Sequence, residues 1–227
     1  IYSKNKYISK TPVVSLAKGM TTINIDGLKS EALVYYRVRY LLGTTTIFSA
    51  LTASSIATTK ASSDYVFAVQ ADPHMDENSS ADVYTQTLEQ IVKASPAFLM
   101  DLGDIFMTDK LPDKTEANIR ARYELMKGFY DKLNGVPFYI TLGNHDGELG
   151  YSNFNTKKYR KEYFPQQTGE LAYYSFTGPD SLHMSLDIFT YTMENPKDDG
   201  WQWTLGKTQY DWLKKTLESS QATHKFV

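Results

Sequence analysis

The sequence contains no cysteine among its 227 residues. Disulfide bonds and thiolate metal sites are therefore excluded, so any metal ion must be held by carboxylate, amide or imidazole groups. Ligands of these types suit manganese, iron, zinc or magnesium ions. The lack of cysteine does not by itself identify a cellular compartment.

Long apolar runs and a strong net charge are absent as well. No apolar stretch approaches the roughly 20 residues that a membrane-spanning helix needs. The net charge is −2, so nothing in the composition indicates specific nucleic-acid binding. Hydrophobic residues make up 41% and charged residues 22% of the chain, which predicts a folded protein with a buried core. The oligomeric state is left open.

The first 61 residues favour β-structure. Residues 33–41 and 46–51 have strand-like patterns, and residues 22–25 alternate between polar and apolar. Residues 52–63 are rich in serine, threonine and alanine, which is typical of a linker. So few strands cannot close a sandwich. We therefore expect residues 1–61 to comprise part of a small all-β domain and its linker.

Short apolar runs alternate with helical patterns from residue 62 onward. Three nearly continuous runs indicate buried strands, over residues 65–69, 97–102 and 138–142. Helical patterns with defined apolar positions cover 81–94 (Val83, Leu88, Ile91, Val92), 114–133 (Ala117, Ala121, Leu125, Phe129) and 207–219 (Tyr210, Leu213, Leu217). Two alternating strands are expected over 171–177 and 182–189. The order of these elements predicts a layered α/β domain over residues 62–227.

Metal-binding types of side chain follow each of the three buried strands: Asp72 and His74, then Asp104, then Asn144, His145 and Asp146. Because ligands bind at the carboxyl ends of strands in open α/β sheets, we expect these side chains to converge on one edge. Gly103 and Gly143 allow the backbone to turn sharply just before the polar residues.

The three clusters, D-x-H, G-D and G-N-H-D, resemble the motifs of the calcineurin-like metallophosphoesterase superfamily. Residues 205–213 (LGKTQYDWL) are similar to a helix of many members, and the resemblance covers about residues 65–227. It implies an α/β (α+β) fold, a layered β-sheet sandwich flanked by helices. It also implies metal-dependent hydrolysis of phosphomonoesters or phosphodiesters, with a small molecule, lipid or nucleotide as the substrate.

The same resemblance implies two divalent or trivalent metal ions, of manganese, iron, zinc or magnesium. Asp72 and His74 are expected to bind the first ion, Asp104 to bridge the two, and Asn144 to bind the second. The ions would polarise the phosphoryl oxygens and supply a hydroxide nucleophile.

Two catalytic residues are expected beside these ligands. The resemblance implies that His145 hydrogen-bonds the phosphate or protonates the leaving group. Asp146 either orients His145 or only shapes the loop. The remaining histidines, His183 in a strand pattern and His224 in a polar loop, are expected to be structural and exposed, respectively.

The N-terminal β-segment resembles the fibronectin-III-like sandwich of purple acid phosphatases. The site departs from those enzymes, because His74 is present and Met107 occupies the position of their colour-giving tyrosine. We therefore expect no iron–tyrosinate colour. Relatives with such a sandwich are often exported, which favours an exported or periplasmic protein, although the localisation is left open.

The family completes its site with a further histidine and a Gly-His-x-His motif, which do not occur before Val227. We therefore expect a chain cut from a longer protein at both ends, with weak or no activity of its own. The alternative is a non-catalytic binding or adhesion module on the same scaffold. A serine hydrolase has no support, because the sequence has no Gly-x-Ser-x-Gly motif.

Overall fold

A computed structural model describes residues 11–15, 25–29, 33–36, 38–42, 44–48, 54–57, 64–76, 78–146, 157–164, 172–188 and 205–227. The chain divides into two compact units, Ile1–Thr59 and Lys60–Val227. Within the described ranges, every helix is too short or too polar to cross a membrane.

The first unit contains two pairs of short antiparallel strands. Strand β1 (Leu33–Tyr36) pairs with β4 (Ser54–Ala57), and β2 (Arg39–Leu42) pairs with β3 (Thr45–Phe48). The run predicted as one strand over residues 33–41 therefore forms parts of two strands that pair with different partners.

The linker predicted over residues 52–63 is wrong where it includes β4. Ile56 lies opposite Val34 in the β1–β4 ladder. The ladder hydrogen bonds use backbone atoms, so a run rich in serine and alanine can still pair as a strand. The predicted strand over 22–25 lies almost wholly outside the described residues, and a β-sandwich in this unit stays a prediction.

The second unit contains two three-stranded sheets. The first is entirely parallel, in the order β5 (Ala68–Gln70), β6 (Leu99–Asp101) and β7 (Phe138–Ile140). The second has the order β10 (His224–Phe226), β9 (Ser181–Ser185) and β8 (Tyr174–Thr177), with β10 parallel and β8 antiparallel to β9.

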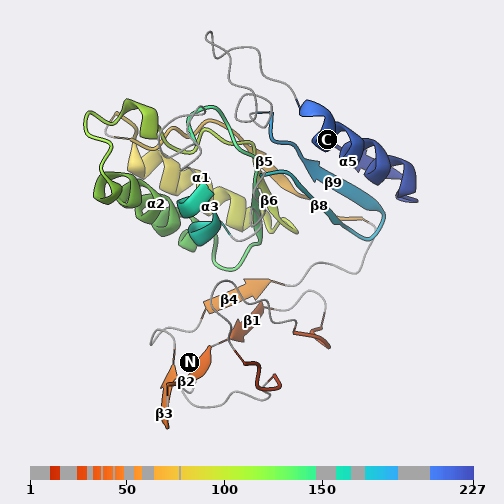
Figure 1. Ribbon diagram of the computed structural model, residues 1–227, viewed down its shortest axis with the longest axis horizontal. Helices are drawn as coiled ribbons and strands as arrows, with labels where there is room; N and C mark the ends of the chain where they lie inside the picture. Colours follow the sequence, from red (N-terminus) through yellow and green to blue (C-terminus); the bar gives the residue numbers. More distant parts are fainter. Residues whose placement is uncertain are drawn as a thin grey trace. The chain divides into compact units, whose positions relative to one another are not determined.

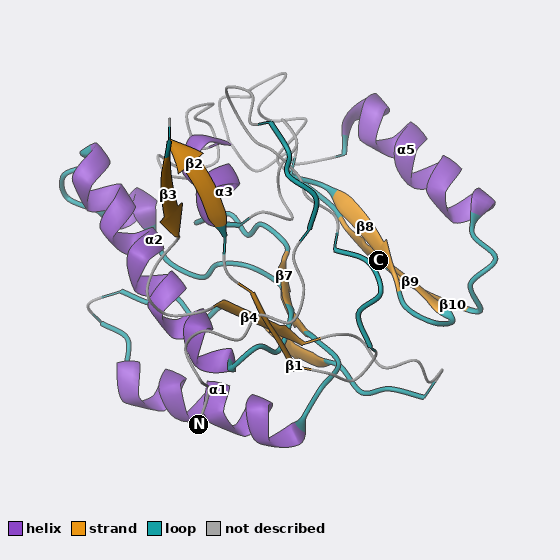
Figure 2. Ribbon diagram, turned by 90° about the horizontal axis from the view of Figure 1, so that it is seen from below, coloured by secondary structure: helices purple, strands orange, loops and turns teal. Residues whose placement is uncertain are grey.

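Helices flank the two sheets. On the side of β5–β7 lie α1 (Ala81–Ala94), α2 (Glu116–Tyr130) and α3 (Lys157–Tyr163), and α5 (Gly206–Ser219) lies on the side of β8–β10 (Figures 1 and 2). Two short 3-10 helices, η1 (Thr108–Lys110) and η2 (Asp131–Leu133), border α2. The expected layered α/β fold is thus confirmed.

Local sequence signals set the limits of α1 and α2. The Ser80 side chain accepts a hydrogen bond from the Val83 N–H and caps α1, and Thr115 caps α2 by accepting from the Asn118 N–H. Such caps satisfy backbone donors that the first helical turn leaves unpaired. Helix α1 ends at Ala94, and the next residue, Ser95, caps it in a left-handed conformation. The predicted range 81–94 is therefore that of α1.

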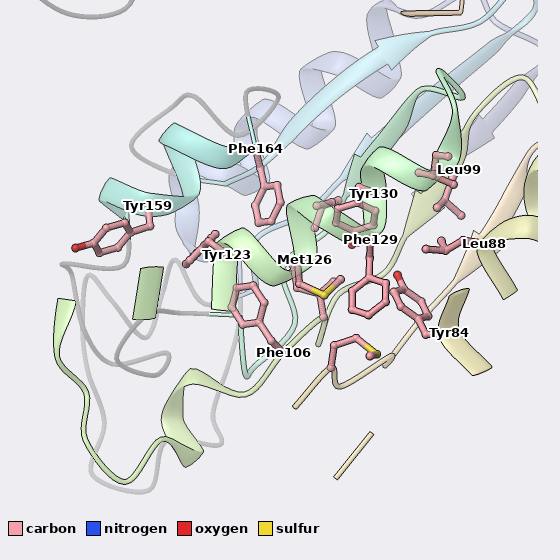
Figure 3. Packing of buried hydrophobic residues seen from close by; sticks show 14 of the residues in the cluster. Tyr84, Leu88, Leu99, Phe106, Tyr123, Met126, Phe129, Tyr130, Tyr159 and Phe164 are labelled. Carbon is pink, nitrogen blue, oxygen red and sulfur yellow. The ribbon is translucent and has the colours of Figure 1, made fainter. Parts of the chain in front are cut away.

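The core beneath α1 and α2 is rich in aromatic side chains (Figure 3). It comprises Met75, Tyr84, Leu88, Leu99, Ile105, Phe106, Ile119, Tyr123, Met126, Phe129, Tyr130, Leu133, Ile140, Tyr159 and Phe164. The face predicted for α2 is largely wrong, since Ala117, Ala121 and Leu125 are exposed. Tyrosine rings bury far more area than alanine, so the aromatic positions turn toward the sheet.

His183 is buried within a row of stacked aromatic rings that crosses the β8–β10 sheet. Its imidazole stacks between Phe176 and Phe226, with ring centroids 4.9 and 4.8 Å away. Its Nε2 lies 2.9 Å from the Tyr65 hydroxyl and 3.0 Å from Ser181 Oγ, and burial lowers its pKa. The structure therefore agrees with a structural role for His183.

Candidate metal centre

The loops that follow β5 and β6 run side by side beyond the ends of their strands. The N–H groups of Asp72, His74 and Met75 donate to the carbonyls of Gly103, Asp104 and Ile105 over 2.9–3.0 Å. This ladder continues the parallel pairing of the two strands. Candidate ligands that are separated by about thirty residues in the sequence are thereby held in register.

Asp72, His74 and Asp104 form a group of potential metal ligands. One donor atom from each lies within 4.8 Å of the other two. His74 Nε2 is 3.4 Å from Asp72 Oδ1 and 3.5 Å from Asp104 Oδ2. The Asp72 side chain is 66% exposed while that of Asp104 is 12% exposed, so the group opens to solvent on the Asp72 side. Two carboxylates and one imidazole form a donor set that suits a divalent transition metal.

These three residues also share an unusual backbone conformation. Asp72, His74 and Asp104 have φ angles of 55°, 44° and 53°. Side chains other than glycine rarely occupy this left-handed region, and residues that do so cluster at functional sites. The only other described non-glycine residues with positive φ are Ser95 and Asn134, and each of them ends a helix.

Gly103 and Gly143 pack against each other at the base of the group. A Cβ atom on Gly103, whose φ is +97°, would lie 2.3 Å from the Gly143 nitrogen. A Cβ atom on Gly143 would lie 2.1 Å from Asp104 Oδ1. Both approaches are far below van der Waals contact, so glycine is required where the loops after β6 and β7 meet.

Asp146 joins those two loops through its buried carboxylate. Its Oδ2 accepts hydrogen bonds from the N–H groups of Asp104 (2.8 Å) and Gly143 (2.7 Å), and its Oδ1 accepts from Ile105 (2.7 Å). Burial raises the pKa of Asp146 to about 7, and the backbone donors oppose that rise. The carboxylate thus holds the loop that carries Asp104, and a role in orienting His145 stays a prediction.

His145 lies beside the group of three. Its backbone N–H donates to Asp104 Oδ1 at 2.9 Å, and its ring centroid is 5.5 Å from that of His74 in an edge-to-face arrangement. Asn144 occupies the same turn, between Gly143 and His145. The roles assigned to Asn144 and His145 stay predictions.

Asp101, the last residue of β6, was not among the predicted site residues. Its side chain is fully buried, and burial raises its pKa to about 6 against the lowering effect of hydrogen bonds from Gln70, the Gly103 N–H and Tyr130. The only signal in the sequence is a charged residue within the otherwise apolar run 97–102. A charge at such a position normally has buried polar partners.

The chain is similar in sequence to curated phosphatases. Tartrate-resistant acid phosphatase type 5 from Homo sapiens is 28% identical over 144 residues, and the Oryctolagus cuniculus protein of that name is 26% identical over the same length. Each match covers 57% of this chain and 42% of the relative, so the chain spans less than half of the length of these relatives.

A crystal structure of a dimetal phosphatase from Danio rerio matches with a TM-score of 0.48 and 15% identity, over 72% of this chain and 69% of that one. The family model for calcineurin-like phosphoesterases matches residues 65–227, which include every predicted site residue. The chain therefore belongs to the calcineurin-like phosphoesterase family.

Proposed function

We propose that this chain carries the first half of a two-metal site that hydrolyses phosphate esters. The observation that carries the proposal is the convergence of Asp72, His74 and Asp104, whose donor atoms lie within 4.8 Å of one another at the edge of the β5–β7 sheet. Family membership supports phosphoester hydrolysis in general. The roles of individual residues rest on the resemblance of their motifs to the family, and the geometry supports them for Asp72, His74 and Asp104 alone.

The donor groups fit the proposed metal ions. Asp72 and His74 would hold the first ion, Asp104 would contribute to both, and Asn144 would offer its amide oxygen to the second. All of these are oxygen or nitrogen donors, as manganese, iron, zinc and magnesium ions prefer. Ions bound here would act as Lewis acids on a phosphoryl oxygen and lower the pKa of a bound water molecule.

Two residues of the third loop would then act on the substrate and on the site. His145, next to His74, would donate a hydrogen bond to a phosphate oxygen or a proton to the leaving group. Asp146 would keep Asp104 in place through the backbone N–H groups of Asp104 and Ile105. The names of the curated relatives favour phosphomonoesters over diesters as the first substrates to test.

The proposal is tested by Mn²⁺ binding together with Mn²⁺-dependent hydrolysis of an aryl phosphate monoester and an aryl phosphate diester. Asp104→Asn should weaken Mn²⁺ binding and abolish metal-dependent turnover, because it removes a shared carboxylate. Asp131→Asn is the matched control, since Asp131 is an exposed aspartate at the end of α2, paired with Lys127. Equal Mn²⁺ binding by Asp104→Asn and wild type would refute the site.

A further inference from the structure

Asp101 has a buried carboxylate and lies three residues before Asp104, one of the candidate metal ligands. Its Oδ1 accepts a hydrogen bond of 3.0 Å from the Gly103 N–H, two residues along the chain. An aspartate that accepts from the second following N–H closes a tight local turn. This turn spans Asp101 to Gly103, and Asp104 follows it directly.

The other carboxylate oxygen of Asp101 is fixed by groups from two further elements. The Tyr130 hydroxyl of α2 donates to Oδ2 at 2.8 Å, and Gln70 Nε2 of β5 donates to it at 2.5 Å. Gln70 Nε2 also donates to the Tyr84 hydroxyl of α1 at 2.8 Å. The Oδ2 atom of Asp101 is thus hydrogen-bonded to β5 and α2, and Tyr84 of α1 reaches it only through Gln70, while the separate Oδ1 atom holds Gly103.

Gly103 transmits this restraint to both ligand-bearing loops. Its carbonyl accepts from the Asp72 N–H at 2.9 Å, and the next residue is Asp104 itself. The side of Gly103 where a Cβ would stand is closed, because that atom would lie 2.3 Å from the Gly143 nitrogen and 2.5 Å from the Thr141 carbonyl oxygen. Displacement of the Gly103 peptide would therefore move Asp72 and Asp104 together.

We propose that Asp101 is a positioning residue of the metal centre, which sets the separation of the Asp72 and Asp104 carboxylates by holding the Gly103 peptide. This inference rests on the metal-dependent function proposed above. Asp101 acts through Gly103 and does not itself bind metal or substrate. What matters in this role is a hydrogen-bond acceptor at the Oδ1 position, rather than the negative charge of Asp101.

The test compares three substitutions in the 227-residue chain by titration with Mn²⁺ at pH 7.5, with free Mn²⁺ measured by electron paramagnetic resonance. Asp101→Ala removes the acceptor and should weaken Mn²⁺ binding at least about tenfold, the lower end of the effect of removing a group that orients a metal ligand. Asp101→Asn keeps an acceptor oxygen for Gly103 and should bind Mn²⁺ within about threefold of wild type. Asp101→Ser, a shorter and weaker acceptor, should lie between the two.

Tyr130→Phe is the control for a loss of stability alone. It removes a donor to the other carboxylate oxygen and leaves the Gly103 hydrogen bond in place, so its melting temperature should fall while Mn²⁺ affinity stays within about threefold of wild type. All affinities are measured at a temperature where circular dichroism shows each variant folded. If the alanine variant does not fold, the comparison of serine with asparagine carries the test.

The outcomes separate this inference from the function on which it rests. A wild-type chain that takes up no Mn²⁺ overturns the metal site and the role of Asp101 with it. If wild type binds Mn²⁺ and Asp101→Ala and Asp101→Ser both bind equally well, the positioning role alone is overturned. Equal losses in Asp101→Asn and Asp101→Ala would show that charge, rather than the hold on Gly103, is what Asp101 supplies.

Discussion

The titration of Asp101 makes the stability of the fold depend on pH in a calculable way. Burial raises its pKa from an ordinary value of 3.8 to about 6 in the folded chain. The folded state therefore binds the proton more tightly than the unfolded state does, and protonation stabilises the fold. The stabilisation that protonation of Asp101 gives to the fold is absent well above pH 6. It grows as the pH falls through 6 and reaches its full size below pH 3.8.

The magnitude follows from the two pKa values. Between pH 8 and pH 5 the linkage relation gives a relative gain of about 1.4 kcal/mol in the free energy of unfolding. Its limit at lower pH is about 3 kcal/mol, because the two values differ by about 2 units and each is worth about 1.4 kcal/mol. For a chain of this size, the gain by pH 5 corresponds to about 3–6 °C in melting temperature.

The perturbation that isolates this term is Asp101→Asn. Asparagine carries no charge at any of these pH values. It can keep the hydrogen bond to Gly103 and the contacts with Gln70 and Tyr130. A half-turn of the Gln70 amide would bring its Oε1, which is buried without a hydrogen-bond partner, to face the new NH₂ group. The substituted chain should therefore fold and lack only the titration of residue 101.

The assay is urea unfolding of both chains, followed by circular dichroism at pH 8 and pH 5 in EDTA. Asp146 and the other titrating groups are present in both chains, so their effects cancel in the difference between them. We expect wild type to gain about 1.4 kcal/mol relative to Asp101→Asn on acidification. A difference that stays constant, or that changes in favour of the asparagine variant, would refute the assignment of a raised pKa to Asp101.

Three further substitutions test other parts of the structure. Gly143→Ala places a Cβ 2.1 Å from Asp104 Oδ1, so it should lower the melting temperature and reduce Mn²⁺ binding at least about tenfold in a titration. Gly128→Ala is its counterpart in the last turn of α2, where nothing lies within 4 Å of the new Cβ; it should raise stability in urea by up to about 0.5–1 kcal/mol and leave Mn²⁺ binding unchanged. Gln209→Ala leaves the N–H and carbonyl of Asp187 without their amide partners and should cost about 2–4 kcal/mol in the same unfolding assay, and a loss below 0.5 kcal/mol would contradict the role assigned to that buried amide.

The sequence predicts that Asp72, His74 and Asp104 converge, because the signal at the strand ends is local and strong. An apolar run followed directly by aspartate, histidine or Gly-Asp marks the end of a buried strand, and the parallel pairing of β5, β6 and β7 then requires the three clusters to meet. The convergence of Asp72, His74 and Asp104 follows from that topology alone. The proximity of these three side chains could thus be predicted from the order of the strands and the positions of the polar residues that follow them.

Helix faces were harder to predict, because burial depends on partners from distant parts of the chain. In α5 the apolar pattern places Tyr210 inside, yet Tyr210 is 56% exposed and Gln209 is fully buried. Gln209 accepts from the N–H of Asp187 and donates to its carbonyl, at 2.8 and 2.7 Å. A polar side chain can be buried when both ends of its amide are paired, and nothing near residue 209 in the sequence reveals that partner.

The burial of Asp101 also depends on partners that are distant in the sequence. Its partners Gln70 and Tyr130 lie 31 and 29 residues away and come from two different elements. The sequence shows only an aspartate at the end of an apolar strand, which is also what a turn-forming residue would look like. The position of the helices over the sheet was needed to show that this carboxylate has three donors.

The left-handed backbone at Asp72, His74 and Asp104 has a consequence for laboratory evolution. Each such residue costs about 1–2 kcal/mol relative to a right-handed conformation, and glycine largely escapes that cost. A library sorted only for the abundance of folded chains should therefore enrich glycine or asparagine at these three positions. A second sort of the same library for metal uptake should reject these substitutions, because they remove the proposed ligands. The substitutions enriched by the two sorts should therefore differ most at Asp72, His74 and Asp104.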